Sequence, residues 1–167
     1  MRRRDFIALI GGAAAWIAPA RAQTLPIIGY LGSENPERYA SRLRAVREGL
    51  AEAGYTEGHN VAIEVRWGEG QYSRLAALAN DLASRPVEVI VAAGGAEVAL
   101  AAKSATTIIP IVFEMGGNPI ALGVVDNLSR PPGNLTGVSS LSVEVSRKRL
   151  EFLREGRSDT KVFAVAL

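Results

Sequence analysis

The sequence predicts an α/β fold, with a doubly wound, mostly parallel sheet and helices on both of its faces. Short apolar runs of the strand type alternate with segments whose apolar residues recur every three or four positions, as they do in helices. One run, residues 87–92, is β-branched and almost continuously apolar, which is typical of a central parallel strand covered on both sides. The alternation repeats at short intervals, and this favours βαβ units in one sheet.

Residues 1–22 are typical of an export signal. Arg2 to Arg4 form a basic head, residues 6–18 form an apolar stretch, and residues 20–22 supply a small-x-small cleavage pattern. We therefore expect cleavage near Ala22 and a periplasmic mature protein. The apolar stretch is shorter than the roughly 20 residues that a membrane span needs. The order Arg-Arg-Asp-Phe-Ile at residues 3–7 resembles a twin-arginine signal, and an ordinary secretory signal is the alternative.

The charge balance argues against nucleic acid as a partner. The whole chain carries 19 Lys and Arg against 17 Asp and Glu. Removal of residues 1–22 takes away four arginines and one aspartate, so the mature chain has no net positive charge. It also contains no basic cluster of the kind that binds nucleic acid. The sequence has no cysteine, which excludes disulfides and thiol chemistry.

From the amino end, the expected strands and helices follow one another in turn. The expected strands cover residues 27–31, 61–67, 87–92, 110–113, 134–138 and 162–167. The expected helices cover residues 39–53, 75–82, 96–105, 119–128 and 143–154. Apolar spacings of three and four predict the first helix, and Gly54 is placed to end it. Ser73 is placed to cap the second helix.

Small and polar residues follow four of the predicted strands and form a candidate ligand site. The candidate binding residues are Ser33, Gly94, Gly95, Ala96, Gly116, Gly117, Asn118, Ser139 and Ser140. In open parallel sheets, ligands bind outside the carboxyl ends of the strands. Glycines let the backbone approach a ligand, and helix N-termini offer free N–H groups to a carboxylate or phosphate. Glycine pairs at such turns also arise for conformational reasons, so only the four segments together indicate a site.

The motifs of enzymes and of nucleotide-binding proteins are absent from the sequence. It contains no G-x-G-x-x-G after the first strand and no P-loop, which favours a small carboxylate over a phosphate. His59 is the only histidine and falls in a turn at the other end of the predicted sheet. No group of residues has metal-ligand spacing, and no serine lies in a G-x-S-x-G elbow. We therefore predict no catalytic residue, no metal and no cofactor. Glu114, after the fourth strand, is expected to face water or a ligand amine.

The apolar run at residues 162–167 has nothing after it to cover it. An exposed strand of this kind is an aggregation hazard. We therefore expect the chain to be a truncated part of a longer protein.

Five segments of the sequence resemble one family. They are residues 3–22, Glu52–Tyr55, Gly58–Val61, Ala105–Phe113 and Pro132–Val138. The family is the substrate-binding proteins of ABC transporters of the tryptophan/tyrosine type, which have the type I periplasmic-binding fold. The resemblance covers nearly the whole chain.

The resemblance implies two doubly wound lobes with an amino-acid-like ligand, possibly aromatic, held between them. The nine candidate residues would line the first lobe's side of that cleft and hold the ligand's carboxylate and amine. The protein would deliver the ligand to an ABC permease in the inner membrane, with no catalytic role. On this basis residues 1–22 are the signal and residues 23–141 are the first lobe. Residues 142–167 are the crossover helix and first strand of a second lobe that is otherwise missing.

Two departures from the family pattern and several alternatives remain. Asn118 stands where many members carry Asp, which removes a partner for a ligand amine, and Pro132 replaces a common glycine. A flavodoxin-like α/β enzyme would instead hold a flavin or nucleotide. The effector-binding half of a transcription regulator would need a DNA-binding segment where this chain has an export signal. A non-functional fragment is the last alternative.

Overall fold

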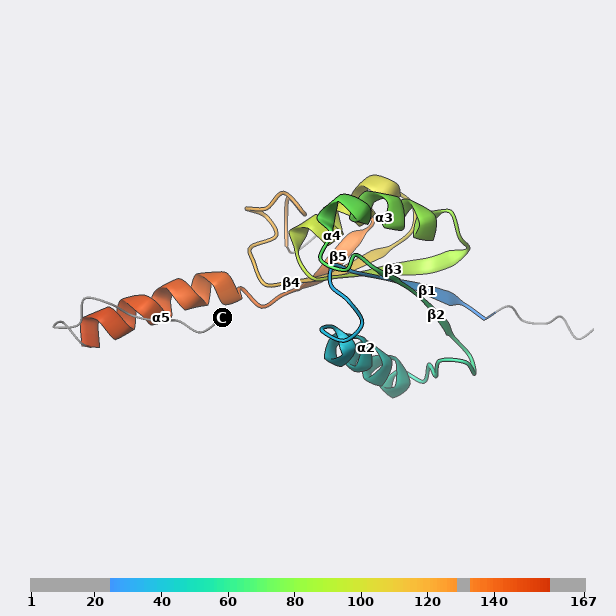
Figure 1. The fold of residues 1–167 in the computed structure, drawn as a ribbon, viewed down its shortest axis with the longest axis horizontal. Helices are drawn as coiled ribbons and strands as arrows, with labels where there is room; N and C mark the ends of the chain where they lie inside the picture. The colour runs from blue at the N-terminus through green and yellow to red at the C-terminus, as the bar shows by residue number, and fades with distance from the viewer. Residues whose placement is uncertain (1–24, 129–132, 157–167) are drawn as a thin grey trace, which may run out of the picture.

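Five parallel strands form one sheet in the order β2-β1-β3-β4-β5 (Figure 1). The computed structural model describes residues 25–128 and 133–156. Its strands are β1 (Ile27–Gly32), β2 (Ala62–Trp67), β3 (Val87–Ala93), β4 (Ile111–Met115) and β5 (Leu135–Ser139). The order reverses between β1 and β3, which is the point of a doubly wound sheet where ligands bind. The predicted fold class is confirmed.

Helices lie on both faces of this sheet, as a doubly wound fold requires. They are α2 (Ala40–Glu52), the short η1 (Tyr72–Arg74), α3 (Leu75–Ala83), α4 (Ala96–Ala105) and α5 (Ser142–Gly156). Figure 1 shows α3 and α4 on one face, α2 on the other, and α5 extending away from the sheet. In the part of the chain that the structure describes, no helix is long and apolar enough to cross a membrane. The predicted signal, Pro132 and the predicted strand 162–167 lie outside the described residues.

The main core lies between the sheet and the pair α3 and α4. Leu82 of α3 and Ile90 and Ile111 of the central strands are fully buried there. Side chains of successive strand residues point to opposite faces, so alternate residues of β4 face this core. Burial of each large aliphatic side chain contributes about 1.5–3 kcal/mol. This face therefore anchors the strand ends that carry the candidate site.

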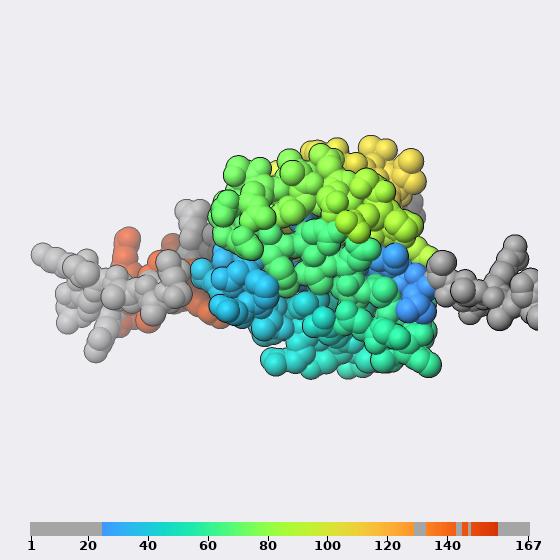
Figure 2. Space-filling model, turned by 45° about the vertical axis from the view of Figure 1, so that its right-hand side comes forward, coloured from blue at the N-terminus to red at the C-terminus, as the bar shows by residue number. Residues whose placement is uncertain are grey.

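The opposite face of the sheet is covered only in part. There α2 packs over β1, and Tyr30 meets Trp67 edge-on, with ring centroids 5.3 Å apart. Beyond α2, the side chains of Val112 on β4 and Val138 on β5 stay exposed, at 38% and 66%. Figure 2 shows the other edge of the molecule, with β2 between the atoms of α3 above and α2 below. The open strip thus lies at the β4–β5 side of this face.

Gly54 ends α2, as the sequence predicts. Its φ of 86° is in the left-handed region, and its N–H donates to the Ala51 carbonyl. The N–H of Tyr55 donates to the Leu50 carbonyl at 2.8 Å. These two bonds form a Schellman motif, which satisfies carbonyls that the helix end leaves free.

Two local predictions are wrong. Residues 119–128 form turns rather than a helix. The Asn118 side-chain oxygen accepts the N–H groups of Ile120 and Ala121, as a helix cap does, but Gly123 then takes a left-handed φ of 70° and ends the turn. The apolar spacing in this segment instead reflects burial of Val124 against the core. Ser73 does not cap α3, because it lies inside η1 and Arg74 occupies the cap position.

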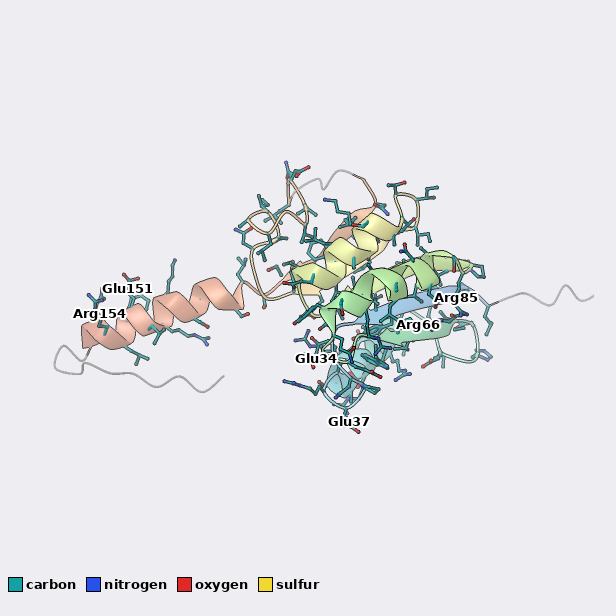
Figure 3. The ribbon with its side chains drawn as sticks, turned by 45° about the horizontal axis from the view of Figure 1, so that its top comes forward. Glu34, Glu37, Arg66, Arg85, Glu151 and Arg154 are labelled. Carbon is teal, nitrogen blue, oxygen red and sulfur yellow. The ribbon has the colours of Figure 1, made fainter. Side chains whose placement is uncertain are left out.

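Four charged residues tie the edge strand β2 to α3. Arg66 donates to Asp81 at 2.6 Å and also contacts Glu64 at 3.4 Å. Arg85 contacts Glu64 at 3.1 Å and Asp81 at 3.3 Å, which closes the ring of alternating charges. Figure 3 shows Arg66 and Arg85 side by side next to α3. Hydrogen bonds from Arg66, and then from Arg85, hold the pKa of Asp81 below its ordinary value.

We expect Asp81→Asn to lower the melting temperature at pH 7, by an amount that disappears in acid. Because the folded-state pKa of Asp81 is lowered, its ionised form stabilises the fold above the ordinary pKa. That contribution is lost as pH falls through the lowered value. Melting followed by circular dichroism at pH 7 and in the acid range checks this. Glu48→Gln, which breaks the exposed Arg44–Glu48 pair, is the control and should change little. A variant effect independent of pH would contradict the linkage.

Replacing Gly54 or Gly49 by alanine should change the free energy of unfolding in opposite directions. Gly54→Ala forces a side chain into the left-handed region and should destabilise the protein by about 1–2 kcal/mol. Gly49→Ala lies inside α2, where an added Cβ meets no atom within 4 Å, and should stabilise by about 0.5–1 kcal/mol. Urea unfolding of both variants measures the difference. Equal effects would contradict the assigned end of α2.

Candidate functional site

The nine candidate residues all lie along one edge of the sheet, which we call the rim. The rim consists of Ser33, Gly94, Gly95, Ala96, Gly116, Gly117, Asn118, Ser139 and Ser140. The strands are parallel, so the segments that leave β1, β3, β4 and β5 emerge at the same edge. Backbone bonds join neighbouring segments, with Ser33 N–H donating to the Ala93 carbonyl and Gly94 N–H to the Glu114 carbonyl.

Ser33 and Gly94 form the first half of the rim, at the β1–β3 switch point. The Ser33 hydroxyl donates to the Gly94 carbonyl at 3.4 Å, and Ser33 is 2% exposed. The Ser33 and Tyr39 hydroxyls also share a hydrogen bond of 2.9 Å. Gly94 has a φ of 115°, and an added Cβ would collide with Ser33 Oγ and the Tyr39 hydroxyl. Glycine is therefore required at this position by both backbone conformation and space.

The second half of the rim joins the segments after β4 and β5. Ser139 Oγ donates to the Gly117 carbonyl at 2.6 Å, and Ser140 N–H donates to the Met115 carbonyl at 3.1 Å. The oxygen of the Asn118 side chain is occupied by the turn that it forms. The side chains of Ser139 and Asn118 thus serve mainly to hold these segments in place.

The N-terminus of α4 points its first N–H groups toward the rim. Gly95 is the N-cap, has a φ of 124° and supplies no side-chain cap. The first N–H groups of a helix lack partners within the helix, and the dipole places partial positive charge there. Glu97 adds a carboxylate in the first turn. An incoming anion therefore meets hydrogen-bond donors and one negative charge at this end.

Tyr39 and Arg42 lie next to the rim and were not singled out from the sequence, whereas Glu114 was. The Arg42 guanidinium lies over the Tyr39 ring, 4.5 Å from its centroid. Arg42 also donates to Glu114 Oε2 at 2.5 Å. Glu114 therefore faces an arginine, rather than water alone. The spacing of Tyr39 and Arg42 at i and i+3 of a helix start is a signal that sequence reasoning could have used.

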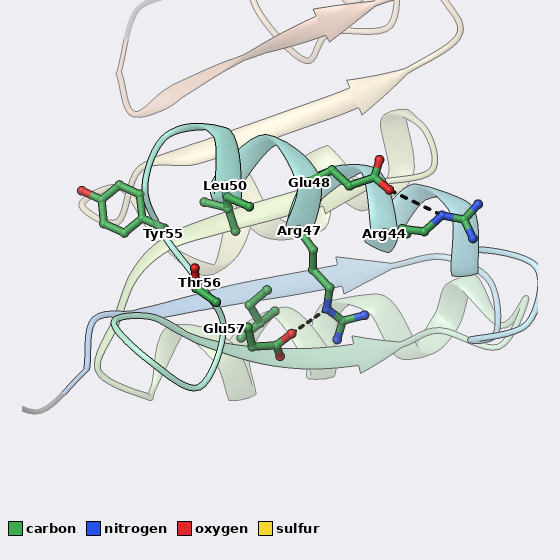
Figure 4. Close-up of a pocket in the computed structure, with 9 residues that line it drawn as sticks. Arg44, Arg47, Glu48, Leu50, Tyr55, Thr56 and Glu57 are labelled. Carbon is green, nitrogen blue, oxygen red and sulfur yellow. Dashed lines mark hydrogen bonds and ion pairs between the residues drawn. The ribbon is translucent and has the colours of Figure 1, made fainter.

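A cavity lies away from the rim, at the carboxyl end of α2 (Figure 4). This cavity of about 310 Å³ is lined by residues between Arg44 and Glu57 and by Ile63. Its charged side chains are already paired, since Arg47 contacts Glu57 at 2.5 Å and Arg44 contacts Glu48 at 3.9 Å. The cavity shares no residue with the rim. His59 is exposed in the turn that follows α2, also away from the rim.

Comparison with known proteins places the chain in a family. Residues 33–162 match the ABC transporter substrate binding protein family, over more than half of the chain. The chain belongs to this family. Among the residues that the structure describes, no group of three or more His, Cys, Asp or Glu could hold a metal ion.

Two relatives of this chain carry names that mention an aromatic amino acid. A tyrosine-binding protein of Clostridioides difficile (strain R20291) is 30% identical over 106 residues, which is 63% of this chain and 30% of that protein. An ABC domain from Streptococcus pneumonia, solved in complex with L-Trp, is 28% identical with a TM-score of 0.63. The match covers 70% of this chain and 39% of that one.

A conserved domain protein from Vibrio cholerae is 25% identical, with a TM-score of 0.74. That match covers 83% of this chain and 46% of the other. The chain therefore spans less than half the length of these three relatives.

We expect Gly94→Ala to destabilise the protein more than Gly70→Ala does. Both glycines have positive φ, but only at Gly94 would an added Cβ collide with neighbours, whereas at Gly70 it meets nothing within 4 Å. Strain at Gly70 should cost about 1–2 kcal/mol, and Gly94 should add the collision with Ser33 and Tyr39. Denaturant unfolding of both variants measures the gap. Equal losses would show that the Ser33–Tyr39–Gly94 contact is looser than described.

Proposed function

We propose that this chain is the first lobe of an exported solute-binding protein that captures an aromatic amino acid and delivers it to an ABC permease. Membership of the substrate-binding protein family supports the general role. The names of two relatives, one tyrosine-binding and one solved with L-Trp, support the ligand class. The observation that carries the proposal is the rim, where segments from four strands are hydrogen-bonded together at the switch point.

The rim suits a small ligand that is bound and released unchanged. Its backbone N–H groups at the start of α4 can donate to a carboxylate. Its glycines let a ligand approach the main chain closely, as Gly94 already does with Ser33 and Tyr39. No step of the role requires a bond to break. The ligand would be held between this lobe and a second one and released at the permease in the inner membrane.

The division of the chain follows from the same proposal. Residues 1–22 are the export signal, cleaved near Ala22, and residues 23–141 form the lobe that carries the rim. Residues 142–167 lead into a second lobe. The exposed side chains of Leu150, Phe152 and Leu153 on α5 support this, because apolar residues on a helix normally pack against another element. Figure 3 shows α5, with Glu151 and Arg154, well away from the sheet.

Titration of the chain without residues 1–22 tests the proposal. One lobe supplies one wall of a cleft, so we expect weak binding, which ligand-observed NMR detects at millimolar concentration. L-tyrosine and L-tryptophan should show saturation transfer and compete with each other, whereas L-glutamate, with a charged side chain, should not. Absence of transfer from every aromatic amino acid, with a folded protein by circular dichroism, would contradict the proposal.

A further inference from the structure

The rim offers hydrogen bonds but no charge. All of its nine residues are neutral, and Asn118 contributes an amide where a carboxylate could stand. An amino acid carries an ammonium and a carboxylate, and each loses hydration when it is bound. Burying a charge is unfavourable unless an opposite charge or several hydrogen bonds replace the water. A site for a zwitterion therefore needs charged partners close to the rim.

Both residues of the Arg42–Glu114 ion pair lie next to the rim. Arg42 comes from the first turn of α2, and its guanidinium stacks on Tyr39, whose hydroxyl binds Ser33. Glu114 comes from the end of β4, and its backbone carbonyl accepts the N–H of Gly94. The two side chains are 44% and 41% exposed, so solvent and small ligands reach both.

A buried hydroxyl without a partner lies beside this pair. The Tyr30 hydroxyl is buried and has no hydrogen-bond partner among the residues that the structure describes. Tyr30, Arg42 and Glu114 line one cavity of about 380 Å³. Burial raises the pKa of Tyr30 to about 12, so the group stays protonated and can only gain by donating to an acceptor. A buried donor left unpaired is unfavourable, which points to an anionic or carbonyl acceptor supplied from outside.

We propose that the Arg42–Glu114 pair opens to receive the charged head of the amino acid. Glu114 takes the ammonium, and Arg42 takes the carboxylate together with the Tyr30 hydroxyl. This inference rests on the proposed function and names the groups that recognise its ligand.

The exchange is favourable on electrostatic grounds. Exposed ion pairs contribute little net stability in water, so opening one costs little. The ligand replaces one ion pair by two and supplies an acceptor to Tyr30. Hydrogen bonds between charged groups are also stronger than those between neutral groups.

Three ligands that differ by one charged group test the assignment. They are L-tyrosine, tyramine, which lacks the carboxylate, and 3-(4-hydroxyphenyl)propionate, which lacks the ammonium. The wild-type chain should prefer L-tyrosine to either analogue by about 10-fold or more, the range expected of a charged hydrogen bond. Affinities are measured by NMR titration.

Arg42→Gln and Glu114→Gln should each lose the preference for L-tyrosine over one analogue and keep the preference over the other. Arg42→Gln should bind L-tyrosine and tyramine about equally, while still preferring L-tyrosine to the propionate. Glu114→Gln should bind L-tyrosine and the propionate about equally, while still preferring L-tyrosine to tyramine. Tyr30→Phe should weaken L-tyrosine and the propionate but not tyramine. Arg47→Gln is the matched control, because Arg47 lies on the same helix in an equally close pair with Glu57, away from the rim. It should leave all three affinities unchanged.

The charge exchange Arg42→Glu with Glu114→Arg separates recognition from a merely structural role. It restores an ion pair between the same positions, so the melting temperature should return toward the wild-type value. L-tyrosine affinity should stay low, because each end of the ligand then meets a like charge. Recovery of both the melting temperature and the L-tyrosine affinity would show that the pair has only a structural role and would overturn the inference.

The outcomes also separate this inference from the proposed function. If the wild-type chain binds no amino acid, both fail. If it binds L-tyrosine and the variants keep the wild-type preferences, only the assignment of Arg42, Glu114 and Tyr30 fails.

Discussion

The parallel alignment of the five strands is the constraint on which the rest of the structure depends. Because every strand runs the same way, four separate connections emerge at one edge, and the reversal of order between β1 and β3 brings Ser33 beside Gly94. That approach leaves no room for a side chain at position 94. A neutral edge of backbone donors, supported by the core beneath α3 and α4, is the consequence. On the other face, α2 is the one helix of the described residues that packs on the sheet, and Val112 and Val138 stay exposed.

Much of this arrangement can be predicted from local pattern. The almost continuous β-branched run at residues 87–92 becomes the central strand β3, and the left-handed Gly54 ends α2 as its position suggests. Local pattern fails at residues 119–128, where helical spacing of apolar residues conceals a chain of turns. The left-handed Gly123 decides that conformation, while burial of Val124 accounts for the apolar spacing. Spacing alone does not distinguish the two cases.

The candidate site, too, can be predicted only in part from the sequence. Small residues after parallel strands can be found in the sequence, because topology alone brings them to one edge. The contact between Arg42 and Glu114 joins residues 72 positions apart, and no local pattern encodes it. The Tyr30 hydroxyl is equally invisible in the sequence, since a tyrosine in a strand normally finds a partner when it is buried. The placement of Arg42, Glu114 and Tyr30 beside one another therefore becomes visible only in the structure.

The central claim is that the ligand binds at the rim and the Arg42–Glu114 pair beside it, and not at the cavity at the carboxyl end of α2. The most direct measurement is the change in backbone amide chemical shifts of ¹⁵N-labelled protein as L-tyrosine is added. The account predicts that the largest shift changes fall at Gly94–Glu97 and Gly116–Gly117. The amide shifts from Leu50 to Glu57, around the cavity at the carboxyl end of α2, should not change. Changes concentrated at Leu50–Glu57 with a silent rim would contradict it.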